Sequence, residues 1–197
     1  MFQSLAKEQI ILASTAKWRG QILKQLNLNH RMLPPRYTEP SFKDGNLESY
    51  VQELATGKAA SLERDFPNAL IIGCDQMAVL EHEPMGKPKD IVEAREQLHL
   101  LKGRTHRLVN GLTVIYKGKS ITRLDEAYLT MRDLSEEEIE SYLKTEEFKG
   151  SCGSYKYEGL GASLFSEVTC KDPHSITGLP VSLLIGILRD LGFSNLL

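Results

Sequence analysis

The alternation of short apolar runs with stretches of helical periodicity constrains the fold of this chain more than any other feature. Residues 9–13 and 69–75 are apolar runs of strand length, and each lies next to a segment whose apolar side chains recur at helical spacing. Two longer strand candidates, 105–116 and 121–131, follow each other with no helix between them. Adjacent strands inside an otherwise alternating pattern favour a mixed sheet over a purely parallel one. The sequence therefore predicts an α/β fold in which helices flank a mixed, twisted sheet.

Helix starts are marked by residues that commonly cap helices. Ser14 is a candidate N-cap, because it directly precedes a stretch with apolar residues at helical spacing. Ser135 and Glu138 match a capping box, in which each side chain accepts a hydrogen bond from the other residue's backbone N–H. Helix starts are predicted near Ser14, Asn46, Asp90, Ser135 and Pro180.

Length and charge narrow the classes of function. The chain of 197 residues is long enough for a domain with its own core, and we expect residues 1–197 to form a single domain. Its formal net charge of −2 provides no cationic surface field. Binding to a nucleic-acid polymer is therefore disfavoured.

The cysteines and the N-terminal segment bear on the cellular compartment. The chain has three cysteines, Cys74, Cys152 and Cys170, and they form no C-x-x-C pair. Because their number is odd, we interpret them as free thiols of a protein in a reducing compartment. Residues 1–14 resemble neither a signal peptide nor a membrane span, because the acidic Glu8 precedes a very short apolar run. We therefore expect a cytoplasmic protein without a membrane-spanning segment.

Several familiar catalytic motifs are absent from the sequence. It contains no G-x-x-x-x-G-K-[ST] loop, no G-x-S-x-G elbow and no G-x-G-x-x-G before a helix. The histidines show no H-E-x-x-H spacing and no cysteine partner at zinc-finger spacing. These absences disfavour P-loop, α/β-hydrolase, Rossmann and structural-zinc interpretations.

Charged residues lie where the predicted elements begin or end. Asp75 ends an apolar strand, and Lys87 stands between Gly86 and Pro88 in a predicted turn. Each has a plain structural explanation, since aspartate is a common turn former and a turn lysine is usually solvated. Arg19 falls in the first turn of the first helix, where a guanidinium and free backbone N–H groups can bind the same anion.

Three further residues indicate a functional site only in combination with other residues. Glu39 lies in an irregular stretch, Lys58 lies at the edge of an apolar helical stripe, and Trp18 is either a core residue or a stacking surface for a base. Hydrolysis of a phosphoanhydride needs carboxylates to hold a divalent metal, cations to neutralise phosphates and a base to orient water. The charged residues at the predicted element ends can supply all three.

Seven motifs, taken in order, resemble a known family. They are ILASTAKWRG, GCDQ, MGKP, GRTHRLVNGLTV, DLSEEEIESYL, GSYKYEGLGASLF and TGLP. Each motif is weak alone, but their order and spacing from Ile10 to Gly192 resemble the Maf family of nucleotide pyrophosphatases. The resemblance covers nearly the whole chain.

The resemblance implies both a fold and a reaction. It implies two lobes around a deep nucleotide-binding cleft, as in Maf and ITPase-like proteins. It also implies a homodimer that cleaves a nucleoside triphosphate into monophosphate and pyrophosphate with a divalent cation, Mg²⁺ or Mn²⁺. Asp75 and Glu39 match the family's catalytic and metal-binding acids. The positions matching its substrate-binding residues are Ser14, Arg19, Lys58 and Lys87.

Within the family, the sequence looks most like the branch that hydrolyses 7-methyl-GTP. Trp18, Gln76 and Glu158 occupy the positions that distinguish this branch from those acting on thymidine and uridine nucleotides. An indole face attracts the cationic 7-methylguanine ring by about 0.5 to 2 kcal/mol. A carboxylate such as that of Glu158 can accept hydrogen bonds from the guanine N1–H and amine together.

Several positions depart from the pattern of this branch. They are Ala16, Lys17, Gly20, Thr38 and Cys74, and they fall in the loops that the resemblance assigns to phosphate. Loss of a hydroxyl and an arginine there would weaken phosphate binding by roughly a few kcal/mol if both contacted it. Two alternatives therefore stay open: a catalytically weakened nucleotide-binding regulator, and a pyrophosphatase with a different base preference.

Overall fold

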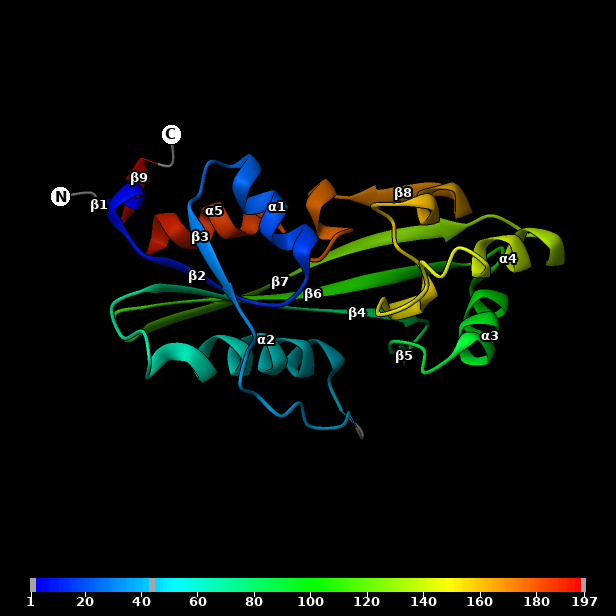
Figure 1. Ribbon diagram of the computed structural model, residues 1–197, viewed down its shortest axis with the longest axis horizontal. Helices are drawn as coiled ribbons and strands as arrows, with labels where there is room; N and C mark the ends of the chain where they lie inside the picture. Colours follow the sequence, from blue (N-terminus) through cyan, green and yellow to red (C-terminus); the bar gives the residue numbers. More distant parts are fainter. Residues whose placement is uncertain (1–2, 43–44, 196–197) are drawn as a thin grey trace. The chain divides into compact units, whose positions relative to one another are not determined.

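The computed structural model describes residues 3–42 and 45–195 (Figure 1). The chain divides into two compact units. The first unit takes its residues from Met1–Asp75, Asn110–Asp125 and Asp172–Leu197. The second unit consists of Gln76–Val109 and Glu126–Lys171.

The described strands form a mixed seven-stranded sheet in the order β3-β2-β4-β6-β7-β8, with β5 paired to β4. β2 runs parallel to both β3 and β4, whereas β5 is antiparallel to β4 and β8 is antiparallel to β7. The mixed α/β fold predicted from the sequence is therefore confirmed. The strands are β2 (Ile10–Ala13), β3 (His30–Leu33), β4 (Leu70–Leu80), β5 (Glu83–Met85), β6 (Thr105–Tyr116), β7 (Lys119–Met131) and β8 (Phe165–Cys170), and a separate parallel pair joins β1 (Gln3–Ser4) to β9 (Phe193–Asn195).

Helices cover both faces of the sheet in the first unit. α2 (Leu47–Glu63) lies on one face, and α1 (Lys17–Gln25) and α5 (Val181–Asp190) lie on the other (Figure 1). Successive residues of β2 alternate between the two sides: Ile10 and Leu12 pack in the core with α1 and α5, while Ile11 and Ala13 pack with α2. Burial on both faces explains why this strand is apolar throughout.

A glycine in β4 sets how closely α2 approaches the sheet. A Cβ on Gly73 would lie 2.8 Å from the backbone nitrogen of Ala59 and still closer to the carbonyl oxygen of Ala55. Only a residue without a side chain fits beneath the helix at this point. This contact fixes the height of α2 over β4.

Most of the predicted helix starts are confirmed. The side chain of Asn46 accepts from the Ser49 N–H before α2, and Asp90 accepts two N–H groups at the start of α3 (Ile91–Leu101). The predicted capping box opens α4 (Glu136–Leu143). The prediction for Ser14 is wrong. Its Oγ accepts a hydrogen bond from the N–H of Ala16 at 3.2 Å in a short turn. The N-cap of α1 is therefore Ala16, two residues after Ser14.

The prediction that a strand ends at Asp75 is also wrong. β4 continues to Leu80, so Asp75 lies in the interior of the strand. Pairing with β5, in which Ala78 lies opposite Met85, extends the strand beyond this residue. A carboxylate is tolerated inside the strand because the ammonium of Lys58 compensates its charge.

The second unit joins α3 and α4 over its own apolar core. Two hydrogen-bonded contacts from Arg95 to Glu140 link the helices, with Nη2 and Oε2 3.1 Å apart. Leu98 in α3 and Ile139 in α4 are fully buried. Among the described residues, no helix is long and apolar enough to cross a bilayer. The three cysteines are free thiols, as expected.

A buried histidine in the second unit makes folding stability depend on pH. His106 lies in β6 with its Nε2 2.7 Å from the hydroxyl of Tyr155, and burial lowers its pKa from 6.5 to about 4. When the pH falls below the pKa that His106 has in the unfolded chain, the imidazole becomes protonated in the unfolded chain but stays neutral in the folded one. The contribution of this residue to stability is therefore lost as pH falls from the unfolded pKa toward the folded one.

We expect this histidine to cost about 2 kcal/mol of unfolding free energy between about pH 7.5 and about pH 5. Urea denaturation of wild type and His106→Gln at both pH values measures the effect as a difference of differences. The gap between the two proteins should narrow by that amount on acidification. A gap independent of pH would contradict a neutral buried His106.

Candidate active site

Asp75 meets Lys58 because of how α2 lies on β4. Every second residue of β4 points to the face covered by α2, and these residues include Ile71, Gly73 and Asp75. Ala59 of α2 packs directly on Gly73. Lys58 precedes Ala59 in the helix, so its side chain reaches the strand two residues beyond the glycine. There its Nζ donates a hydrogen bond to Asp75 Oδ1.

Lys58 also binds the second predicted acid, Glu39. Its Nζ lies 2.9 Å from Glu39 Oε1, so one ammonium bridges two carboxylates. The exposed fractions of the side chains are 12% for Lys58, 10% for Asp75 and 53% for Glu39. The site thus has a buried side at Asp75 and an open side at Glu39.

Burial and charge act in opposite directions on the titration of this cluster. Burial raises the pKa of the Asp75 carboxyl, and the charges of Lys58 and Arg19 only partly oppose the shift. Burial alone would lower the pKa of Lys58, but Asp75 and Glu39 outweigh it and raise that pKa. A carboxylate with a raised pKa is a better proton acceptor than an ordinary aspartate.

Arg19 adds a second cation with an unused donor. Its Nη1 donates to the carbonyl oxygen of Cys74 at 3.1 Å, which holds the guanidinium beside the residue that precedes Asp75. Its Nε is buried and has no hydrogen-bond partner within residues 3–42 and 45–195. A buried charged donor without a partner costs about 1 to 3 kcal/mol or more, which an anionic ligand can recover.

The two acids suit a divalent cation that a substrate helps to hold. In the described part of the chain, no group of three or more His, Cys, Asp or Glu side chains could hold a metal by itself. Mg²⁺ is commonly bound by one or two carboxylates together with substrate phosphates and water. Asp75 and Glu39 both contact the Lys58 ammonium, so the two carboxylates lie close enough to share a cation, which fits that donor set.

Ser14 and Trp18 belong to the same unit as Asp75, and their contact with a substrate stays a prediction. Ser14 is buried just after β2, and Trp18 is half-buried in the first turn of α1. The indole Nε1 donates to the carbonyl oxygen of Thr177 at 3.0 Å, which holds this edge of the ring. This bond uses the polar edge of the indole and not its faces.

The remaining predicted residues belong to the second unit. Gln76 is half-buried in β4, while Lys87 and Glu158 are exposed in segments between helices and strands. The backbone carbonyl of Gln76 accepts a weak hydrogen bond from the thiol of Cys152 at 3.5 Å. Their approach to the cluster around Asp75 stays a prediction.

Two of the departures from the family pattern have structural partners. A Cβ on Gly20 would lie 2.5 Å from Met32 Sδ, so a side chain at this position would point toward β3. Cys74 is fully buried, and burial raises the pKa of its thiol. Its backbone carbonyl still holds Arg19, because that contact does not depend on the side chain.

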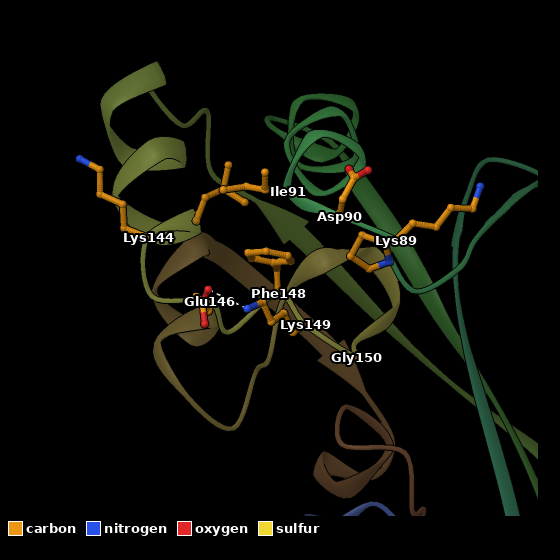
Figure 2. A pocket seen from close by; sticks show the side chains of 10 residues that line it. Lys89, Asp90, Ile91, Lys144, Glu146, Phe148, Lys149 and Gly150 are labelled. Carbon is orange, nitrogen blue, oxygen red and sulfur yellow. Dashed lines mark ion pairs between the residues drawn. The ribbon is translucent and has the colours of Figure 1, made fainter.

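The second unit contains a pocket of about 590 Å³. Figure 2 shows the ring of Phe148 next to the ion pair between Glu146 and Lys149. Lys149 Nζ lies 2.6 Å from Glu146 Oε1. None of the predicted site residues lines this pocket, although Pro88 and Lys89 at its rim follow Lys87 in sequence. We therefore do not identify it with the predicted nucleotide site.

Comparison with known proteins decides the family. The profile described as Maf-like protein matches residues 9–191. The chain belongs to the Maf family. Two relatives named 7-methyl-GTP pyrophosphatase, from Colwellia psychrerythraea and Chromohalobacter salexigens, are each 36% identical to it. These matches cover 95% of this chain and 94% or 98% of the respective relative.

Another similar relative is named for different nucleotides. The protein named dTTP/UTP pyrophosphatase from Acholeplasma laidlawii is 32% identical over 182 residues, covering 92% of this chain and 95% of that protein. The resemblance to the Maf family, stated from the motifs alone, is thus confirmed.

Sequence reasoning missed two contacts between α2 and the segment that carries Glu39 in this Maf protein. Tyr50 Oη donates to the carbonyl oxygen of Pro40 at 2.6 Å, and Tyr37 packs against Gly57 in α2. An isolated glycine inside a helical pattern is a signal that could have drawn attention to the second contact.

Proposed function

We propose that this Maf-family chain hydrolyses the α–β phosphoanhydride of a nucleoside triphosphate, giving a nucleoside monophosphate and pyrophosphate. The observation that carries the proposal is the buried carboxylate of Asp75, whose pKa is raised and which shares one ammonium with Glu39. The names of the relatives support the same reaction class.

In this mechanism Asp75 accepts a proton from a water whose oxygen attacks the α-phosphorus. The bond between the α-phosphorus and the bridging oxygen breaks, and the electron pair leaves on pyrophosphate. Arg19 and Lys58 neutralise the phosphates, and the family pattern assigns Lys87 the same role. When bound by Asp75 and Glu39, Mg²⁺ or Mn²⁺ supplies Lewis-acid stabilisation of the phosphate charge.

Hydrolysis in ¹⁸O-labelled water tests the bond that is cleaved. Attack at the α-phosphorus places the labelled oxygen on the monophosphate, and mass spectrometry of both products detects it there. The assay uses 7-methyl-GTP, GTP, dTTP and UTP with Mg²⁺ or Mn²⁺. Label in pyrophosphate, or absence of turnover on all four nucleotides, would overturn the proposal.

We further propose 7-methyl-GTP as the favoured substrate. Support comes from Trp18, whose indole is oriented by its bond to Thr177, and from the two relatives with that name. The assignment of Gln76 and Glu158 to base recognition rests on the resemblance. A cationic ring stacked on Trp18 gains an attraction that neutral guanine lacks.

Replacement of Trp18 with leucine should weaken this preference selectively. We expect the ratio of kcat/KM for 7-methyl-GTP over GTP to fall by about 2-fold to 30-fold, which corresponds to the loss of one cation–π contact. Phe66→Leu, at a half-buried aromatic residue beside Arg31, serves as the matched control. An unchanged ratio in Trp18→Leu would exclude stacking of the base on this residue.

Three further properties are also proposed: a single functional domain over residues 1–197, a homodimer and a cytosolic location. The first is supported by the family match over residues 9–191 and by the three strands, β4, β6 and β7, that contribute residues to both units. The other two rest on the resemblance and on the free thiols. Light scattering coupled to size-exclusion chromatography tests the dimer.

A further inference from the structure

We propose that residues 36–42 form a strap along α2 that positions Glu39, and that Tyr37 seated on Gly57 sets its placement. The inference rests on the proposed function, because it assigns positioning residues to the site that contains Asp75. These residues form no helix or strand. The first of them contact the C-terminal half of α2, and the last contact its first turn.

One end of the strap is attached near the C-terminus of α2. The backbone N–H of Arg36 donates to Ser61 Oγ at 3.0 Å. The guanidinium of Arg36 lies 2.7 Å from a carboxylate oxygen of Asp65, just beyond the helix. This ion pair is exposed and therefore weak, but together with the hydrogen bond it gives the strap a starting point.

The other end is attached near the N-terminus of the same helix. Tyr50 Oη donates to the carbonyl oxygen of Pro40 at 2.6 Å. The ring of Phe42 packs against the ring of Tyr50 with their centroids 5.1 Å apart. Both contacts lie beyond Glu39 in sequence, so the acid is flanked by attachments on either side.

Tyr37 provides the contact nearest to Glu39 on the other side. A Cβ on Gly57 would lie 2.7 Å from Cδ2 of the Tyr37 ring and still closer to Cε2 and Cζ. Gly57 lies inside α2, where glycine is unfavourable compared with alanine. The ring occupies the space that a side chain at position 57 would fill. The glycine therefore makes room for Tyr37, although it lowers the helix propensity of α2.

Glu39 needs such positioning because burial does not hold it. Its side chain is 53% exposed, while its partner Lys58 is fixed in α2 directly after Gly57. The seat of Tyr37 and the ammonium that Glu39 binds therefore lie on adjacent residues of one rigid helix. A shift of the Tyr37 ring moves the strap relative to both Lys58 and Asp75.

The test is Gly57→Ala, with Gly186→Ala as matched control. Gly186 also lies inside a helix, but within 4 Å its added Cβ would meet only the end of the Arg123 side chain, at 3.3 Å. We expect kcat to fall about 10-fold to 100-fold in Gly57→Ala alone. The melting temperature should change by less than about 3 °C in either variant, because the gain in helix propensity offsets the cost of the new contact. Wild-type kcat in Gly57→Ala would overturn the inference.

Two cycles separate positioning from a general structural effect. In a Tyr37→Ala or Glu39→Gln background, Gly57→Ala should cost no further kcat, because the ring or the acid is already gone. Tyr37→Phe should keep wild-type kcat, because it keeps the ring. A full additional loss in either background, or a defective Tyr37→Phe, would contradict the strap.

Failure of the proposed function gives a different pattern. It appears as absence of turnover by wild type, whatever Gly57→Ala does. Amide hydrogen exchange of residues 36–42 then still tests the strap. Exchange should accelerate in Gly57→Ala and stay unchanged in Gly186→Ala, and equal exchange in all three proteins would overturn the inference.

Discussion

Replacement of Asp75 with asparagine is expected to lower kcat by about 100-fold to 10,000-fold, the range spanned by loss of a general base. Asparagine has nearly the same shape but cannot accept the proton of the attacking water. Substrate binding should change less, because Arg19 and Lys58 are retained. Pyrophosphate release from 7-methyl-GTP at saturating Mg²⁺ measures the effect.

Asp190→Asn is the matched control for this substitution. Asp190 is also an ion-paired aspartate of the first unit, but it binds Arg123 at the end of α5 and is half exposed. Its replacement should leave kcat within about twofold, as expected of an exposed ion pair. Retention of more than about one tenth of kcat in Asp75→Asn would remove this residue as the base.

Much of the fold follows from local patterns in the sequence. The predicted strand 105–116 coincides with β6, and the capping residues Asn46, Asp90 and Ser135 each precede the helix they were expected to open. These signals are local, because a cap bonds to residues two or three positions away. Such features need no knowledge of the rest of the chain.

The errors arise where distant residues decide the local structure. The extension of β4 beyond Asp75 depends on pairing with β5, and a carboxylate can lie in the strand only because Lys58 reaches it. Ser14 satisfies a turn before α1 and not the helix itself. Short strands such as β3 and β5 carry too few residues to show a pattern of their own.

The candidate site could be predicted only through the family resemblance. Lys58 and Asp75 are 17 residues apart, and nothing in their local sequence requires them to meet. What joins them is the seat of Ala59 on Gly73, which sets the register of α2 over β4. Once that contact is known, the period of two along the strand places Asp75 within reach of Lys58.

Loss of Lys58 should destabilise the protein strongly, because it leaves a buried carboxylate without its cation. We expect Lys58→Met to lower the free energy of unfolding by about 3 to 5 kcal/mol, the usual cost of removing one member of a buried ion pair. Urea denaturation at constant pH measures the loss. Lys149→Met, which breaks the exposed pair with Glu146, should cost no more than about 1 kcal/mol.

A double variant decides whether the uncompensated charge of Asp75 causes that loss. In Lys58→Met/Asp75→Asn the buried charges disappear together, and the neutral amide needs no cation, so most of the lost stability should return. A loss that persists would instead assign the effect to packing of the lysine stem between α2 and β4. We expect stability to recover without turnover, because the buried charges of Lys58 and Asp75 are costly to folding but are assigned to the reaction.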